Sequence, residues 1–378
     1  MNKITFLMLH LNYGGIEKQV STLVNSLADQ YEIEIISLYN ILGKPFYKLD
    51  SRIKVRYIFD YGPNHKEIVQ ALKKFQVKKL FSELKKGLKI LYTKFFRIGK
   101  IVDELDTDIL ISSRIEFSKQ IKRKDIVVIS QEHSYINTNQ YKRKVKKSFK
   151  NVDYLIVMTE RARELYETWF RECRERPRVV LIPNMISDYH GEGTNLHNKQ
   201  IISVGRLEPV KDFTSLINVY SIIEKKHPDW CLKIIGEGSQ REKLEKQILS
   251  LGLKDKVILT GRLTSDEIEH ELDHSSIFLL TSKSESFSLV IVEAMAHNVP
   301  CVSYDIDVGP REIITNKEDG ILVDDRNENQ MAEEACMLIE DSVKRVEFGT
   351  KARKTAEKFF VSNISKEWKE FLDKLLEA

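Results

Sequence analysis

The chain has 378 residues, 42% of them hydrophobic and 31% charged, and a formal net charge of +4. This composition is typical of a soluble globular protein of two domains, and the lack of any run of about 18 apolar residues excludes a membrane-spanning helix. The four cysteines have neither metal-ligand spacing nor a pairing pattern, so we expect reduced structural thiols, without zinc or disulfides. Residues 1–15 indicate a first β-strand and not a signal peptide, which predicts a protein that stays inside the cell.

Short β-branched runs alternate with amphipathic helical stretches from end to end, which predicts an α/β protein with parallel sheets. Six strands are expected in the first half, at 3–9, 32–39, 53–59, 108–113, 126–133 and 154–159. Six more are expected in the second half, at 200–205, 231–236, 256–261, 276–282, 301–305 and 320–323. The polar residues 183–200 lack an apolar period and are expected to link the two halves.

This pattern predicts two domains, residues 1–190 and residues 191–357, followed by a terminal helix at 358–378. The helix carries one apolar stripe, formed by Ile364, Trp368, Phe371, Leu372 and Leu375. An apolar stripe must be buried against another element. We expect the terminal helix to pack back on the first domain.

A basic, amphipathic helical region is expected from 72 to 102, with a break at Gly87. Its lysines occupy faces other than the apolar one: Lys78, Lys79, Lys85, Lys86 and Lys89. The pattern fits a core-packed helix with a solvated basic face, or a surface that binds anionic lipid headgroups and inserts Phe81, Phe95 and Phe96. Nucleic acid is not expected, because no recognised binding motif accompanies the charge.

Ligands of open parallel sheets bind beyond the carboxyl ends of the strands. After the strand at 200–205, Arg206 and Lys211 precede a helix for which Asp212 is an N-cap candidate. Two cations at a helix N-terminus favour an anion such as a diphosphate, and two solvated surface charges give the same pattern. The Gly-Glu-Gly at 236–238 indicates either a tight strand-to-helix turn or a ligand loop.

The segment SKSESFSLVIVEAMAHNVP, residues 282–300, places Glu285 at the mouth of an apolar helix and Glu293 inside it. A carboxylate among apolar neighbours needs hydrogen-bond donors. Ligand hydroxyls, such as those of a ribose, would supply them, and so would an arginine or backbone amides. We expect this helix to begin near Ser286 or Glu285.

Two features of the first half lie at the same kind of strand end. Gly14 and Gly15 follow the first strand, where they form a plain tight turn or let a phosphate or sugar approach the backbone. His133 ends a later strand, where an imidazole either meets a substrate or is structural. The Asp-Ile-Asp at 305–307 has the spacing of a metal motif, but without a further ligand we interpret it as a strand end.

Together these motifs resemble the retaining GT-B glycosyltransferases, specifically glycosyltransferase family four. The resemblance covers most of the chain and is strongest from 201 to 325. There four segments stand in the family's order and spacing: SVGRLEPVKDFTSLI, GEGSQREKLE, TSKSESFSLVIVEAMAHNVPCVSYDIDVGPREII and DGILV. The resemblance implies an α/β GT-B fold, in which two Rossmann-like domains with parallel sheets face a central cleft.

The resemblance also implies roles for single residues. Arg206 and Lys211 match the basic pair that binds the donor diphosphate, and Glu293 matches the glutamate that holds the nucleotide ribose. Glu285 would contact the donor sugar beside the reacting centre, and His133 would approach the transferred sugar. Further donor contacts are implied at the glycine loop and at the start of the helix: Gly14, Gly15, Ser286, Phe287, Ser288 and Leu289.

This chain departs from the family at two of these positions. Ser286 and Ser288 stand where the family often has glycine, so a different sugar preference is expected.

The implied reaction is transfer of a sugar from a nucleotide-diphosphate donor, expected to be a UDP-sugar, to an acceptor hydroxyl with retention of configuration. No cofactor and no metal ion are expected. The implied acceptor is a lipid-linked glycan intermediate of bacterial surface polysaccharide, and the implied location is cytoplasmic, peripheral on the inner face of the membrane. A nucleotide-sugar epimerase and a non-catalytic membrane-recruiting relative are the alternatives. A nicotinamide dehydrogenase would need the complete dinucleotide fingerprint, which is absent.

Overall fold

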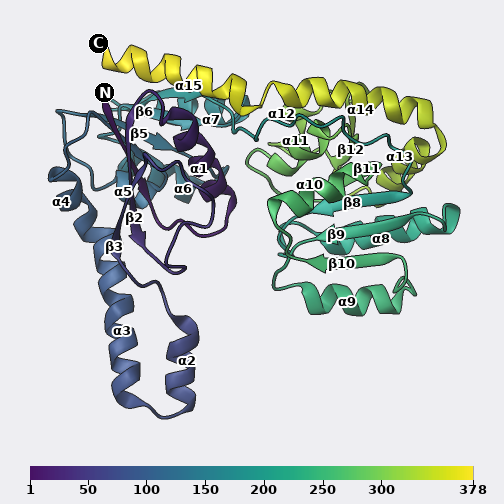
Figure 1. Cartoon of the computed structure of the whole chain (residues 1–378), viewed down its shortest axis with the longest axis horizontal. Helices are drawn as coiled ribbons and strands as arrows, with labels where there is room; N and C mark the ends of the chain where they lie inside the picture. The colour runs from purple at the N-terminus through teal and green to yellow at the C-terminus, as the bar shows by residue number, and fades with distance from the viewer. Residues whose placement is uncertain (378) are drawn as a thin grey trace. The chain divides into compact units, whose positions relative to one another are not determined.

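The computed structural model of the chain describes residues 1–377 (Figure 1). It consists of two compact units: unit 1 comprises Met1–Pro183 and the residues from Ser365 onward, and unit 2 comprises Asn184–Ile364. The sequence placed the corresponding boundaries after residues 190 and 357, and Ala378, the end of the expected terminal helix, lies outside the described residues. Each unit contains one parallel sheet with helices, which confirms the α/β class with two Rossmann-like domains.

Unit 1 is built on a seven-stranded parallel sheet in the order β3-β2-β1-β4-β5-β6-β7. The strands are β1 (Lys3–Met8), β2 (Glu32–Tyr39), β3 (Lys54–Phe59), β4 (Ile109–Ser112), β5 (Val127–Gln131), β6 (Tyr154–Val157) and β7 (Arg178–Leu181). The first six were expected. Strand β7 was missed because it is a four-residue edge strand between Pro177 and Pro183, and prolines argue against a central strand.

The helices of unit 1 are α1 (Gly15–Leu27), α2 (His65–Lys73), α3 (Val77–Tyr92), the π-helical η1 (Thr93–Arg97), α4 (Ile98–Asp103), α5 (Ile115–Ser118), α6 (Asn139–Ser148) and α7 (Glu160–Phe170). The C-terminal part of α15 (Val361–Leu376) also belongs to unit 1. There Trp368 and Leu372 are buried, and Phe371 packs edge-on against Tyr154 of β6 with ring centroids 5.3 Å apart. The apolar stripe of this helix is thus covered within unit 1.

The basic helical region forms a hairpin in which α2 and α3 lie side by side and extend away from the sheet of unit 1 (Figure 1). The expected break at Gly87 was wrong. Gly87 lies inside α3, and the chain turns instead at Phe75, whose φ is 51°. A glycine costs a helix about 1 kcal/mol, which the other turns of the 16-residue α3 offset. We call residues 67–97 the arm.

Unit 2 is built on a six-stranded parallel sheet in the order β10-β9-β8-β11-β12-β13. Its strands are β8 (Gln200–Val204), β9 (Cys231–Ile235), β10 (Val257–Gly261), β11 (Ile277–Leu280), β12 (Cys301–Tyr304) and β13 (Gly320–Val323). Its helices, besides the start of α15, are α8 (Phe213–Lys226), α9 (Arg241–Ser250), α10 (Ser265–Asp273), α11 (Leu289–Ala296), α12 (Pro310–Ile313), α13 (Glu328–Glu340) and α14 (Ser342–Glu357). All six strands were expected from the sequence.

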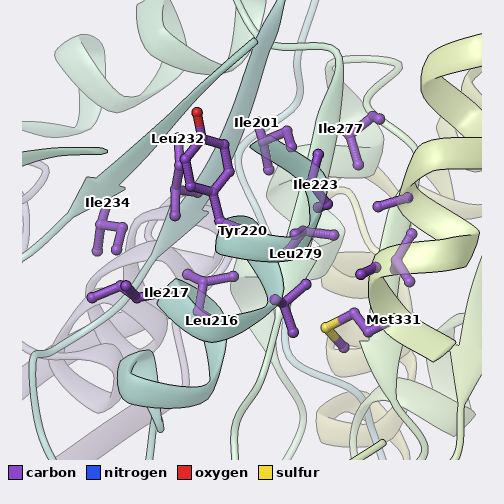
Figure 2. Close-up of a cluster of buried hydrophobic side chains, with 14 of the residues drawn as sticks. Ile201, Leu216, Ile217, Tyr220, Ile223, Leu232, Ile234, Ile277, Leu279 and Met331 are labelled. Carbon is purple, nitrogen blue, oxygen red and sulfur yellow. The ribbon is translucent and has the colours of Figure 1, made fainter. Parts of the chain in front are cut away.

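The core of unit 2 lies between its sheet and the helices that cover it. Leu216, Tyr220 and Ile223 recur at helical spacing along α8 and are fully buried. They face Ile201 of β8 and Leu232 of β9 (Figure 2). Because α8 is anchored along its length, the loop that leads into it from β8 starts and ends at fixed points.

Each sheet reverses its strand order at one place. In unit 1, β1 lies between β2 and β4, and in unit 2, β8 lies between β9 and β11. The loops that leave the two strands at such a reversal diverge and open a crevice, where ligands of parallel sheets bind. Within residues 1–377, none of the helices combines the length and the apolarity that a membrane crossing requires.

Candidate functional site

The expected donor residues of unit 2 follow the two strands at the reversal of strand order. Arg206 and Lys211 come after β8, and Glu285 comes after β11, which pairs with β8. The backbone amide of Lys283 donates to the carbonyl oxygen of Val210 at 2.7 Å, so the two loops are joined directly. Residues that are far apart in the sequence therefore meet at one edge of the sheet.

Lys211 and Glu285 form an ion pair. The Lys211 ammonium donates to Glu285 Oε1 at 2.5 Å, and the side chains are only 17% and 9% exposed. Solvent screens such a shielded pair less than it screens a surface pair. Gly309 backs the pair, since a Cβ added there would lie 2.8 Å from the Cβ of Glu285. The sequence analysis did not single out Gly309, whose φ of 97° also favours glycine.

Arg206 differs from Lys211 in its surroundings. Its side chain is exposed, and within residues 1–377 its guanidinium takes part in neither an ion pair nor a hydrogen bond. The site thus offers one cation that is free and a second that a carboxylate holds. Both cations would be available to an anionic ligand that displaces the Glu285 carboxylate.

Asp212 occupies the N-cap position of α8 but does not cap the helix, which corrects the expectation from sequence. Its backbone is left-handed, with a φ of 49°, and its carboxylate accepts a hydrogen bond from Arg326 Nη1 at 2.9 Å. Arg326 also donates to the carbonyl oxygens of Thr281 at 2.9 Å and Ser282 at 2.7 Å. One guanidinium therefore fixes both loops.

Arg326 was missed because nothing in its own sequence context marks it. It lies three residues beyond β13 and reaches Asp212, which is 114 positions away. Its guanidinium stacks on the Tyr304 ring at 4.5 Å from the centroid. Such a residue holds the site in shape without needing to touch a ligand.

Helix α11 begins at Leu289, later than expected, because Ser288 has a left-handed backbone with a φ of 81°. This conformation costs a residue other than glycine roughly 1–2 kcal/mol. The hydroxyl of Ser288 is buried and has no hydrogen-bond partner within the described chain. Of its neighbours, Ser286 is half-buried, while Phe287 is buried and packs edge-on against Phe359 with ring centroids 5.3 Å apart.

Glu293 lies on the partly exposed strip of α11. Leu289, Val290 and Glu293 are half-buried, whereas the residues from Ile291 to Ala296 other than Glu293 are buried. The spacing of these three residues places them along one side of the helix, continuous with its start. A carboxylate is tolerated in this apolar segment because its position faces out of the core.

The Gly-Glu-Gly loop after β9 has a structural explanation. A Cβ on Gly236 would lie 1.8 Å from the carbonyl oxygen of Gly205, and one on Gly238 would lie 2.4 Å from that of Leu207. The amide of Leu207 also donates to the carbonyl oxygen of Glu237 at 3.0 Å. Glycines are required here because this loop packs backbone to backbone against the loop that carries Arg206.

In unit 1, His133 follows β5 and is partly buried. Its Nε2 is inaccessible to water and has no hydrogen-bond partner within the described chain. Burial, assisted by the charge of Arg114, lowers the pKa of His133 to about 4. The imidazole is therefore neutral at neutral pH and can donate or accept one further hydrogen bond.

The glycine loop of unit 1 contains a carboxylate that the sequence analysis missed. Gly14 precedes α1, and a Cβ added to it would lie 2.1 Å from Oε2 of Glu17. Oε1 of Glu17 lies 3.3 Å from Nδ1 of His10, and burial raises the pKa of the Glu17 carboxyl. The space beside Gly14 is thus filled by this chain's own acid, whereas Gly15 faces open space. The sequence did contain a signal for this contact, because Glu17 lies in the first helical turn after Gly14 and Gly15.

Residues 1–377 hold no cluster of three or more His, Cys, Asp or Glu side chains that could bind a metal ion. In the Asp-Ile-Asp motif, Oδ1 of Asp305 accepts a hydrogen bond from Nε of Arg311 at 2.9 Å. The motif directly follows β12, so it forms a strand end.

Comparison with known proteins identifies the fold of the chain and the family of unit 2. Residues 189–355 match the family model of the glycosyl transferases group 1. An exopolysaccharide phosphotransferase of Streptomyces coelicolor is 30% identical over 99% of the chain, which spans 41% of that protein. A Campylobacter jejuni α-1,4-N-acetyl-D-galactosaminyltransferase, named for an undecaprenol-diphosphate-linked glycan, is 26% identical, with 97% of each chain covered.

Among solved structures, that of Anabaena HepE in complex with UDP and glucose superposes with a TM-score of 0.74 at 17% identity, covering 99% of this chain and 100% of HepE. This likeness extends over both units, and at such low identity it reports on the fold alone. It shows that the chain has the GT-B architecture, in which residues 189–355 match the glycosyl transferases group 1.

Proposed function

We propose that the protein transfers a sugar from a nucleotide-diphosphate donor, a UDP-sugar, to a hydroxyl of a lipid-linked or polymeric glycan, with retention of anomeric configuration. The observation that carries this proposal is the arrangement of Arg206, Lys211 and Glu285 at the reversal of strand order in unit 2. Two cations and an acid at one sheet edge match the needs of a diphosphate joined to a polyhydroxylated sugar. The resemblance to glycosyltransferase family four and the UDP bound by HepE agree with it.

In the proposed reaction, the bond between the anomeric carbon and the donor diphosphate breaks, and a bond to the acceptor oxygen forms on the same face, while the proton of the acceptor hydroxyl passes to the leaving diphosphate. Negative charge grows on the leaving diphosphate. Arg206 and Lys211 would stabilise it, and Glu285, once released from Lys211, would accept hydrogen bonds from the donor sugar. Glu293 would accept hydrogen bonds from the ribose. Neutral His133 of unit 1 would hydrogen-bond to the transferred sugar.

We further propose that the arm binds anionic membranes. Its apolar side chains face solvent: Phe75 is 90% exposed, Phe81 69% and Phe96 71%. On α3 and η1 the exposed apolar residues alternate at spacings of four and three: Val77, Phe81, Leu84, Leu88, Leu91 and Phe95. This stripe would normally be covered by a partner surface.

The charges of the arm favour a lipid partner over a second copy of this chain. Residues 67–97 contain nine Lys or Arg and only Glu67 and Glu83 as acids. Lys78 and Lys85 follow stripe residues directly and are exposed without ion pairs in the described chain, so two arms would repel each other. Anionic headgroups complement the same pattern. Of the remaining predicted lysines, Lys79 pairs with Glu67, Lys86 pairs with Glu83, and Lys89 lies over the Phe59 ring.

Calorimetric titration with UDP and a panel of UDP-sugars, followed by incubation of the preferred donor with membrane extract, tests the transferase proposal. We expect UDP to bind, and Arg206→Gln to weaken binding at least tenfold, because it removes a cation from the diphosphate. Lys246→Gln is the matched control, since Lys246 is exposed on α9 and, within residues 1–377, pairs only with Glu242. If neither UDP nor any of the UDP-sugars binds, the proposal is contradicted.

The products distinguish the alternatives. A transferase leaves free UDP and an acceptor extended by one sugar, whose anomeric configuration is read by NMR. An epimerase would convert the donor sugar without any acceptor. Product that retains a donor phosphate between sugar and acceptor would indicate phosphotransfer, the activity for which the Streptomyces relative is named.

A further inference from the structure

Arg114 of unit 1 is a half-buried cation without a partner. It lies two residues beyond β4, at the reversal of strand order beside β1. Its Nε is inaccessible to water and unbonded, and within residues 1–377 the guanidinium makes no ion pair and no hydrogen bond. A charged group removed from water is costly unless it is paired. No acid among residues 1–377 forms an ion pair with the Arg114 guanidinium.

The backbone around Arg114 is held in place. Its carbonyl oxygen accepts hydrogen bonds from the amides of Phe117 and Ser118, the last two residues of α5. The Ser118 hydroxyl is 3.1 Å from that of Ser112 on β4 and 3.0 Å from that of Ser130 on β5. These buried hydroxyls tie the ends of the two strands together. The position of Arg114 is thus fixed, although its guanidinium is unpaired.

None of the titratable groups near Arg114 forms an ion pair with it within residues 1–377. Burial lowers the pKa of His10 and of His133, and the Arg114 charge lowers both further, so both imidazoles are neutral at neutral pH. The nearby acid, Glu17, is directed to His10 at 3.3 Å; burial raises the pKa of its carboxyl, and the charge of Arg114 lowers it in part. At the end of β5, Gln131 Oε1 is likewise buried without a partner. Within residues 1–377, Nε of Arg114, Nε2 of His133 and Oε1 of Gln131 are therefore all buried without a hydrogen-bond partner.

We infer that Arg114 forms an acceptor subsite in unit 1 that binds a phosphoryl group, the phosphate that joins an acceptor glycan to its lipid carrier. Arginine is the side chain best suited to this role, because its planar fork of donors matches phosphate oxygens. The nearby imidazole of His133 is neutral and adds no charge to this subsite. This inference rests on the proposed transferase function, and it concerns the acceptor and not the donor.

Inorganic pyrophosphate is the probe, titrated calorimetrically into full-length protein. Because Arg206 and Lys211 would also bind pyrophosphate, the titrations use protein that carries the double substitution Arg206→Gln/Lys211→Gln. We expect that protein to bind pyrophosphate, and addition of Arg114→Gln to weaken binding at least tenfold. Arg114→Lys should restore part of the affinity. Arg178→Gln, an exposed arginine of the same sheet, is the matched control and should change nothing.

Near-UV circular dichroism establishes that each variant is folded. If the Arg206→Gln/Lys211→Gln protein does not bind pyrophosphate, or if Arg114→Gln leaves its affinity unchanged, the inference is wrong. If Arg114→Gln in otherwise native protein weakens UDP binding instead, the cation belongs to the donor and the inference is again wrong. Absence of UDP binding by the native protein contradicts the transferase proposal separately, because the pyrophosphate titration does not depend on it.

In kinetic assays of active enzyme, Arg114→Gln distinguishes an effect on acceptor binding from an effect on donor binding. Arg114→Gln should raise the KM for a phosphate-bearing acceptor at least tenfold and leave the KM for the UDP-sugar unchanged. An acceptor of the same glycan without phosphate should show no difference between the variant and the native enzyme. Equal KM values for both acceptors in native enzyme would also overturn the inference.

Discussion

Lys211 and Glu285 are bonded at 2.5 Å, so each satisfies the other. The proposed reaction needs them apart, with the ammonium on the diphosphate and the carboxylate on the sugar. Donor binding would then exchange one ion pair for two ligand contacts. Arg206, which is exposed and unpaired, would make the first contact with the incoming anion.

Glu285→Gln tests this exchange. The amide no longer holds Lys211 by charge, so the lysine becomes available to the diphosphate. We expect the Kd for UDP to stay the same or to fall, while kcat drops about 10²-fold or more because the contact to the sugar is weakened. Calorimetry and steady-state kinetics measure the two effects. A rise in the Kd for UDP similar to the loss of kcat would argue against the exchange.

Ser288→Gly should stabilise unit 2. Glycine adopts the φ of 81° without strain, and the substitution removes a buried hydroxyl that has no partner in the described chain. We expect a gain of about 1 kcal/mol in the free energy of unfolding, or about 2–4 °C in Tm. Ser288→Ala is the control, since it removes the hydroxyl but keeps the strain. If alanine stabilises as much as glycine, backbone strain is not the cause.

The arm should determine membrane binding. Full-length protein is expected to sediment with vesicles of phosphatidylcholine and phosphatidylglycerol, and less with phosphatidylcholine alone. Phe75→Ser combined with Phe81→Ser should reduce binding at least tenfold, because both rings are exposed in the free protein. Lys78→Gln combined with Lys85→Gln should remove the preference for the anionic vesicles.

The matched control for the arm variants is Leu249→Ser, a 60% exposed apolar residue on α9 of unit 2. Sedimentation velocity without vesicles tests the competing explanation. A native dimer that the phenylalanine variants convert to a monomer, together with unchanged vesicle binding, would show that a second copy covers the stripe.

His133 should make stability depend on pH. Its pKa is about 4 in the folded protein, below the ordinary value of 6.5, so the unfolded chain binds more protons between these values. The imidazole therefore favours the folded state fully above pH 6.5, and this contribution is lost as the pH falls towards 4. We expect the Tm of the native protein to fall more steeply over this interval than that of His133→Gln. Parallel curves would contradict it.

Local sequence determined much of this protein. Twelve of the thirteen strands were expected, because buried parallel strands are continuous apolar runs that end at glycine or polar residues. The positions of Arg206 and Lys211 relative to β8, and of Glu285 relative to β11, followed from the same pattern. The exception, β7, is short and lies between prolines.

Only the tertiary structure decided which of these residues meet. Strand order brings β8 beside β11, and with them Lys211 beside Glu285, because pairing between strands is set by packing across the whole sheet and not by the residues near either strand. The contact of Arg326 with Asp212, across 114 positions, likewise depends on the fold. So does Arg114, because the sequence does not show that Nε of its side chain lacks a partner in the described chain. The sequence shows which side chains can carry a charge, but the desolvation and the partners of each charged group depend on the residues that surround it in the folded protein.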